Sequence, residues 1–149
     1  MEAPTMGKVL VRARIENIRE SLDARAGRIR PEEVRAVEVH DAVVDTGAKL
    51  LGLPKRMVDQ LGLQPLEHRE AMTSVGRVPC KIYGAVRLEI EGRQCTVDVA
   101  EVADECPVLI GYVPLELLDF VVDPTTQRLI PNPKDGGQRL LDLFYTPRG

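Results

Sequence analysis

Short runs in which apolar and polar residues alternate make up most of this chain. Residues 6–15 alternate with a period of two, which places every second side chain on the same face and predicts a strand. Val34, Val37 and Val39 favour a second strand, which continues into the apolar residues 42–44. Further apolar or alternating runs predict strands at residues 50–54, 78–86, 86–90, 96–102 and 107–111.

Two short helices are expected between these strands. Pro54 suits the first helical position and Gly62 suits the residue that ends a helix, so residues 55–61 predict one helix. Residues 114–118 predict the other. Residues 16–31 are charged and irregular, although their few apolar positions also fit a short helix.

Turn residues connect neighbouring strands into hairpins. Glu91-Gly92 is a tight hairpin turn, and residues 120–130 predict a closing hairpin. Residues 63–71 are polar and form either a link or the start of a hairpin. Many short strands without a strand–helix–strand rhythm predict an all-β domain, a closed barrel with two short helices.

Composition narrows the class of protein. The 149 residues are enough for one domain with a substantial core. A net charge of -3 argues against a nucleic-acid-binding surface. No apolar run reaches the roughly 20 residues of a membrane helix, so no membrane contact is expected. The first residues show no secretory signal, and we expect a cytoplasmic protein.

The cysteines and histidines predict neither a disulfide framework nor a metal site. Cys80, Cys95 and Cys106 are odd in number and lack a Cys-x-x-Cys pair, which favours free thiols in a reducing compartment. His40 and His68 stand alone, without a second ligand at a suitable spacing. We expect no metal and no cofactor.

One carboxylate stands where an apolar strand breaks into a glycine turn. Asp45 follows residues 42–44 and precedes Thr46, Gly47 and Ala48. Gly47 lets the backbone turn tightly and approach a substrate, the Thr46 hydroxyl is placed to fix the loop by hydrogen bonds, and Ala48 leaves room beside the carboxylate. The same residues also fit a plain turn in which Asp accepts backbone hydrogen bonds. The tetrapeptide alone leaves both interpretations open.

The order of the parts that follow is more specific. A glycine-tipped hairpin at residues 73–77 comes next, then paired strands at residues 81–93, then Leu109-Ile110-Gly111 before a short helix, and residues 118–123 close the region. In this order the chain resembles the retropepsin-like aspartic proteases, the single-domain group of retroviral proteases and their cellular and bacterial relatives. It is more similar to the cellular and bacterial branch. The resemblance covers residues 34–130.

This resemblance implies an aspartic endopeptidase and assigns roles to individual residues. Asp45 would be the catalytic carboxylate, Thr46 would lock two active-site loops across a dimer, and Gly47 and Ala48 would contact the substrate backbone. Residues 73–77 would form a flap over an extended peptide, with the residues Thr73, Ser74, Val75 and Gly76 binding substrate. Leu109 would line a side-chain pocket, with Ile110 and Gly111 behind the site.

The chemistry requires a second chain. Two carboxylates about 3 Å apart share one proton, so that one takes a proton from water while the other donates to the substrate carbonyl. This sequence contains one Asp-Thr-Gly. A two-fold homodimer would place Asp45 beside its symmetry mate, and a monomer would be inactive.

Three departures from the retroviral pattern keep other functions open. Lys49 and Leu50 stand where retroviral enzymes carry acidic residues, and Tyr112 replaces the arginine that pairs with one of them. A catalytically weak module that binds a peptide or partner in the same cleft is therefore an alternative. A third interpretation is a domain that only assembles, with residues 140–145 as an added interface strand.

The expected organisation is one domain with two less distinctive ends. An N-terminal strand and charged loop, residues 1–33, would belong to the same domain as the protease region, residues 34–130. Residues 131–149 would form a tail that contains a terminal interface strand.

Overall fold

The structure of the chain, a computed structural model, describes residues 8–144 and residue 146. Strands predominate in the described residues, with three α-helices and two short 3-10 turns. In chain order the elements are β1 (Leu10–Asn17), α1 (Ile18–Arg25), η1 (Pro31–Glu33), β2 (Ala36–Val44), β3 (Leu51–Pro54), α2 (Lys55–Leu61), β4 (Gln64–Thr73), β5 (Gly76–Ile90), β6 (Arg93–Val102), β7 (Leu109–Ile110), α3 (Tyr112–Leu118), β8 (Phe120–Asp123), β9 (Arg128–Pro131) and η2 (Lys134–Gly137).

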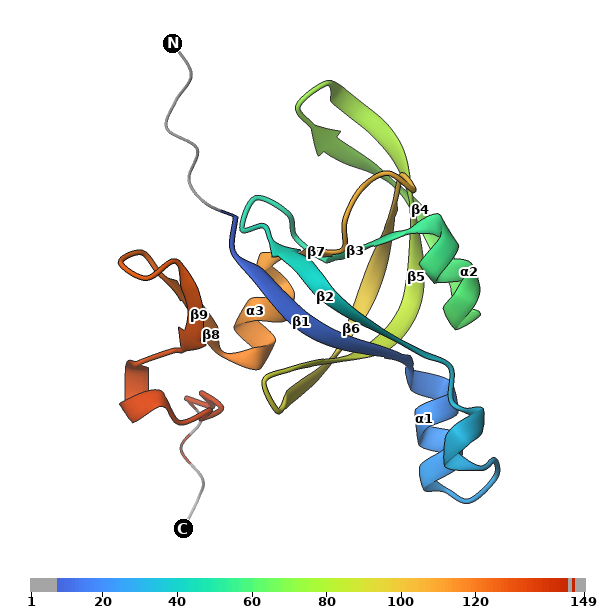
Figure 1. The fold of residues 1–149 in the computed structure, drawn as a ribbon, viewed down its shortest axis with the longest axis horizontal. Coiled ribbons are helices and arrows are strands. Elements are labelled where there is room, and N and C mark those ends of the chain that lie inside the picture. The colour runs from blue at the N-terminus through green and yellow to red at the C-terminus, as the bar shows by residue number, and fades with distance from the viewer. Residues whose placement is uncertain (1–7, 145, 147–149) are drawn as a thin grey trace.

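Seven strands form one sheet that closes on itself (Figure 1). Their order is β1-β2-β7-β3-β6-β5-β4, and β1 also pairs with β5. The strands from β1 to β5 in this order therefore form a ring, and β4 extends beyond it. β8 and β9 form a separate two-stranded hairpin. The all-β fold predicted from the alternating pattern is confirmed.

Alternate side chains of the ring strands fill its interior. In β1 every second residue from Val11 onward is buried, as a period of two requires. The side chains of Ile15, Leu51, Leu88 and Ile110 are fully enclosed. Burying a side chain of this size stabilises a fold by about 1.5–3 kcal/mol. Leu51 and Ile110 pair across the neighbouring strands β3 and β7, so the strand that follows the loop between β2 and β3 begins in the buried core.

The helix predicted at residues 55–61 is confirmed as α2. Gly62 ends it with φ 64°, a left-handed conformation that glycine adopts without steric cost, and its N–H donates to Asp59 O over 3.0 Å. The Arg35 guanidinium occupies the space that a side chain at position 62 would need.

The number of helices was predicted wrongly, since the structure has three α-helices rather than two. The additional helix, α1, lies within the charged residues 16–31. Asn17 caps it, because its Oδ1 accepts the Glu20 N–H over 3.1 Å while its Nδ2 donates to Leu61 O over 2.9 Å. Ser21 is its one buried residue. Ile18 and Leu22, whose spacing fitted a short helix, are half-buried and exposed, so the apolar pattern indicated this helix only weakly. None of the helices in the described residues is long and apolar enough to cross a membrane.

Other boundaries differ in detail from the sequence analysis. Residues 63–71 belong mostly to β4, and the two runs at 78–86 and 86–90 form the single strand β5. Residues 140–144 form no strand in this single chain, and Tyr145, the end of the predicted interface strand, lies outside the described residues, as do Met6 and Gly7 of the first predicted strand.

Candidate active site

The loop that carries Asp45 joins the end of β2 to the start of β3. β7 lies between these two strands, parallel to β2 and antiparallel to β3. The Val43 N–H donates to Val108 O over 2.8 Å, and the Asp45 N–H donates to Ile110 O over 2.9 Å. The sheet therefore fixes the Asp45 backbone, and the half-buried carboxylate stands where the strand ends.

Hydrogen bonds within the loop hold the Asp45 side chain. Its Oδ1 accepts the Gly47 N–H over 3.0 Å, and its backbone carbonyl accepts the Ala48 N–H over 3.1 Å. This is the turn that an Asp followed by Thr-Gly favours. A side chain at position 47 would place its first carbon 3.2 Å from Asp45 Oδ1, which is a tight contact. Glycine therefore favours the 3.0 Å distance between its own nitrogen and Asp45 Oδ1.

The N-terminus of α3 holds the second half of the loop. The Tyr112 N–H donates to Ala48 O over 2.9 Å, and the Val113 N–H donates to Lys49 O over 3.0 Å. The first N–H groups of a helix have no partner inside the helix, and here loop carbonyls accept them. This helix was predicted to begin at residue 114, which missed Tyr112 and Val113. Gly111 is its N-cap, a position that glycine tolerates.

Gly111 permits the close approach between loop and helix. Its N–H donates to Leu50 O over 3.1 Å. A side chain at this position would place its first carbon against Leu50 O and within 2.7 Å of Ala48 O. Real side chains do not occur at such distances, so the loop lies on Gly111 only because the residue is glycine.

The remaining residues of the predicted loop and its support differ in exposure. Thr46 and Gly47 are exposed, and Ala48 is half-buried. Leu109 is half-buried beside Gly52 of β3, and Ile110 is fully buried. The structure thus brings residues 45–50 together with residues 109–113 through backbone hydrogen bonds and leaves the Thr46 side chain at the surface.

The predicted flap residues form the turn of a long hairpin made by β4 and β5. Thr73 Oγ1 donates to Gly76 O over 2.8 Å and accepts the Val75 N–H over 3.2 Å, which closes the turn. Ser74 and Val75 lie at the tip, and the Val75 side chain is 85% exposed. Figure 1 shows this hairpin projecting beyond the ring of strands.

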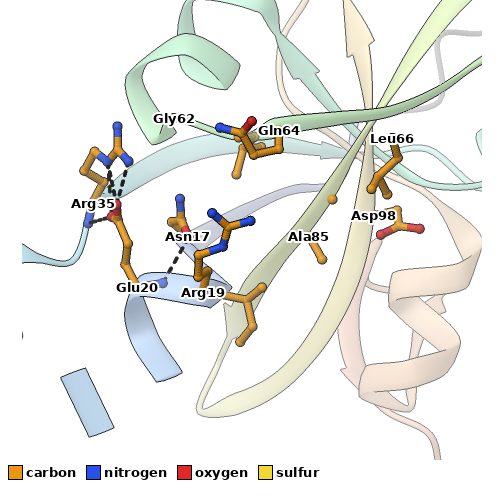
Figure 2. A pocket seen from close by; sticks show the side chains of 12 residues that line it. Asn17, Arg19, Glu20, Arg35, Gly62, Gln64, Leu66, Ala85 and Asp98 are labelled. Carbon is orange, nitrogen blue, oxygen red and sulfur yellow. Dashed lines mark hydrogen bonds and ion pairs between the residues drawn. The ribbon is translucent and has the colours of Figure 1, made fainter. Parts of the chain in front are cut away.

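Two cavities in the described residues lie away from Asp45. One of about 380 Å³ is lined by residues that include Asn17, Arg19, Gln64 and Asp98, with the Glu20–Arg35 ion pair to one side (Figure 2). A second, of about 250 Å³, is lined by charged residues of β1, β2 and β5. Asp45 lines neither of these two cavities.

The thiols of Cys80 and Cys95 are weakly reactive, and no cluster of potential metal ligands accompanies them among the described residues. Burial raises the pKa of Cys95 to about 11, and burial is also the main cause that raises the pKa of Cys80. Both thiols are therefore protonated, and weakly nucleophilic, at neutral pH. In the described part of the chain, no group of three or more His, Cys, Asp or Glu side chains is arranged to hold a metal ion.

Comparison with known proteins agrees with this geometry. The sequence model of a family described as aspartyl protease matches residues 22–113. The chain therefore belongs to the aspartyl protease family, and the match contains the Asp45 loop, the β4–β5 hairpin and β7. It begins earlier than residue 34, where the resemblance was placed from the sequence. It also ends before residue 130, so β1, β8 and β9 lie outside the matched residues.

The chain is also similar to a protein whose name states no activity. A UPF0210 protein of Methanopyrus kandleri is 30% identical over 117 residues, which cover 74% of this chain and 25% of the relative. The chain thus spans about a quarter of the length of that relative.

Proposed function

We propose that this protein is an aspartic endopeptidase that is active as a homodimer. One observation carries the proposal: half-buried Asp45 stands in a loop that neighbouring strands and a helix N-terminus fix in place by hydrogen bonds. The sequence provides one such Asp-Thr-Gly loop. A second carboxylate in the same setting would then come from a second copy across a two-fold axis.

The reaction follows from the pairing of two carboxylates. Two such groups about 3 Å apart hold one proton between them. The ionised Asp45 takes a proton from water, the water oxygen bonds to the carbonyl carbon of the peptide, and the protonated Asp45 of the other copy donates to the carbonyl oxygen. The first Asp45, now protonated, donates its proton to the amide nitrogen, and the ionised Asp45 of the other copy takes a hydroxyl proton from the tetrahedral intermediate. The carbon–nitrogen bond then breaks to give a carboxylic acid and an amine. Such a shared proton requires an acidic-to-neutral optimum.

The neighbouring residues have supporting roles in this proposal. Exposed Thr46 is free to meet the loop of the other copy, and Gly47 and Ala48 border the carboxylate. Thr73, Ser74, Val75 and Gly76 would cover an extended peptide, and half-buried Leu109 would contact one of its side chains. A reducing compartment such as the cytoplasm is consistent with the three free thiols.

Cleavage of a diverse peptide library between pH 3 and pH 9 tests the proposal. The Asp45→Asn variant should lose cleavage and keep its fold, because the substitution preserves shape and removes only the ionisable group. Asp41→Asn is the matched control, since Asp41 is an exposed carboxylate on β2. Equal cleavage by Asp45→Asn and wild type would contradict the proposal, as would activity that rises steadily through pH 9.

The same experiment distinguishes the alternative, a catalytically weak peptide-binding module. Lys49 is exposed beside the Asp45 loop, and Tyr112, at the start of α3, is 39% exposed. These residues offer a cation and an aromatic ring in place of the acidic and arginine residues of retroviral enzymes. A protein shown to be dimeric that binds library peptides without cleaving them would favour the binding module.

A further inference from the structure

Helix α3 is held at both of its ends by other parts of the chain. At its N-terminus, backbone N–H groups donate to carbonyls of the Asp45 loop, as described above. At its C-terminus, Leu117 O accepts hydrogen bonds from Arg139 Nε over 3.1 Å and Nη2 over 2.6 Å. Arg93 Nη1 donates to Leu118 O over 3.0 Å and to Asp119 O over 2.9 Å. We call Arg93 and Arg139 the arginine clasp.

The clasp also joins α3 to two other segments. Arg93 Nη2 donates to Gly137 O over 2.8 Å, and Arg139 Nη2 donates to Gln94 O over 2.8 Å. The Arg93 guanidinium lies 5.0 Å from the centre of the Phe120 ring, which adds a cation–π contact. The start of β6, the end of α3 and the segment after β9 are therefore fixed to one another by two side chains.

Physical chemistry favours this arrangement at a helix C-terminus. The last carbonyls of a helix have no partner inside it, and the helix dipole attracts cations there. The clasp supplies guanidinium donors to carbonyls of three consecutive residues, Leu117, Leu118 and Asp119. A helix of seven residues is about 10 Å long, at roughly 1.5 Å per residue. Because the helix is so short, a displacement of one end also displaces the other end.

We propose that Arg93 and Arg139 are positioning residues for the Asp45 loop, acting through α3. Through the helix, the clasp restrains the positions of Tyr112 and Val113, whose N–H groups donate to the loop carbonyls. The consequence for catalysis rests on the proposed function, in which the loop must hold two carboxylates within about 3 Å of each other. The effect of the clasp on the position of the loop does not rest on the proposed function.

Amide hydrogen exchange in the full-length protein, read residue by residue by NMR, tests the proposal. In Arg139→Ala the amides of Tyr112 and Val113 should exchange about tenfold faster than in wild type, as expected when charge-assisted hydrogen bonds are lost. The amide of Gly62 at the end of α2 should be unaffected. Arg139→Lys, which restores a cation with a single donor group, should give an intermediate rate.

Two outcomes would overturn the proposal. Unchanged exchange at Tyr112 and Val113 would mean that the clasp does not reach the loop. Equally faster exchange at Gly62 would mean that Arg139 contributes only to global stability. Arg28→Ala is the matched control, because Arg28 is an exposed arginine whose ion pair with Asp23 lies far from α3 in the chain; its exchange pattern should equal that of wild type.

A kinetic measurement extends the test where cleavage is found. Arg139→Ala should lower kcat several-fold and change KM by less than about twofold, because the clasp orients the carboxylate rather than the substrate. An increase in KM with kcat unchanged would contradict a positioning role. If Asp45→Asn shows that the chain is no protease, the exchange experiment still decides whether the clasp positions the loop.

Discussion

The Asp45 loop and the turn between β4 and β5 both connect two strands, yet they are supported very differently. The loop is held by hydrogen bonds with β7 and with the N-terminus of α3, and the neighbouring side chains of Leu51 and Ile110 are fully buried. The hairpin turn is closed by its own Thr73, and none of the residues of β4 is fully buried. Under the proposed function, a fixed carboxylate and a weakly supported cover would suit a site that must admit and release a long substrate.

Replacement of Gly111 by Ala should have the largest effect on this difference. The added carbon has no room against the carbonyls of Leu50 and Ala48, so the loop must shift. We expect the free energy of unfolding to fall by roughly 3 kcal/mol, measured by chemical denaturation. A loss below about 0.5 kcal/mol would show that the loop is not tightly held.

The same substitution in the hairpin turn should cost less. Gly76 has φ 106°, which disfavours any other residue, but an added carbon there meets nothing within 4 Å. Gly76→Ala should lower the free energy of unfolding by about 1–2 kcal/mol, from backbone strain alone. A cost equal to that of Gly111→Ala would remove the contrast between the two turns.

The ion pair between Glu20 and Arg35 predicts how the stability of the fold depends on pH, separately from titration of the active site. Hydrogen bonds from Arg35 hold the pKa of Glu20 below its ordinary value of 4.5, although burial opposes them. Because the folded-state pKa is lowered, this ion pair stabilises the fold at neutral pH, and its contribution is lost as the pH falls through the lowered pKa. Glu20→Gln should therefore cost roughly 0.5–1 kcal/mol at pH 7.

That cost should shrink in denaturation experiments as the pH is lowered below the ordinary pKa of 4.5 towards pH 3. An equal cost at pH 3 and pH 7 would show that the ion pair is not the cause. Activity of the Glu20→Gln variant that follows the wild-type profile in mild acid would assign that profile to the active site rather than to the fold.

The smallest effect is expected at the hairpin surface. Met72 is 77% exposed next to the turn, so Met72→Ser should change the free energy of unfolding by less than about 0.5 kcal/mol. A reduced affinity for peptides in the same variant would support the proposed place of the adjacent residues 73–76 over the substrate. A large loss of stability would show that the hairpin packs against the body of the protein.

Local signals in the sequence were sufficient for much of the fold. Helix α2 was predicted with its ends because Pro54 and Gly62 mark them. Strand β1 was predicted because alternate residues are buried, and β3 because its short apolar run is buried throughout. The turn at Asp45 was also visible, since apolar residues lead into it. These features depend on residues close together in the chain.

Features that depend on distant residues were not predictable. Most of β4 gave no strand signal, because its side chains are almost all exposed and β5 alone supports it. Arg93 and Arg139 look like ordinary surface arginines in the sequence, because their partners lie 22 to 45 residues away. The support of the Asp45 loop by Tyr112 and Val113 is a backbone interaction, which side-chain patterns do not encode.

The central claim is that one chain provides half of a catalytic site, and a subunit-mixing experiment tests it most directly. Asp45→Asn chains are mixed with wild-type chains at a total concentration that keeps the protein dimeric, and cleavage is expressed per wild-type chain. With mutant chains making up about nine-tenths of the mixture, random pairing should lower this activity roughly tenfold, because most wild-type chains are then paired with an inactive partner. Cleavage per wild-type chain that does not change on mixing would contradict the account.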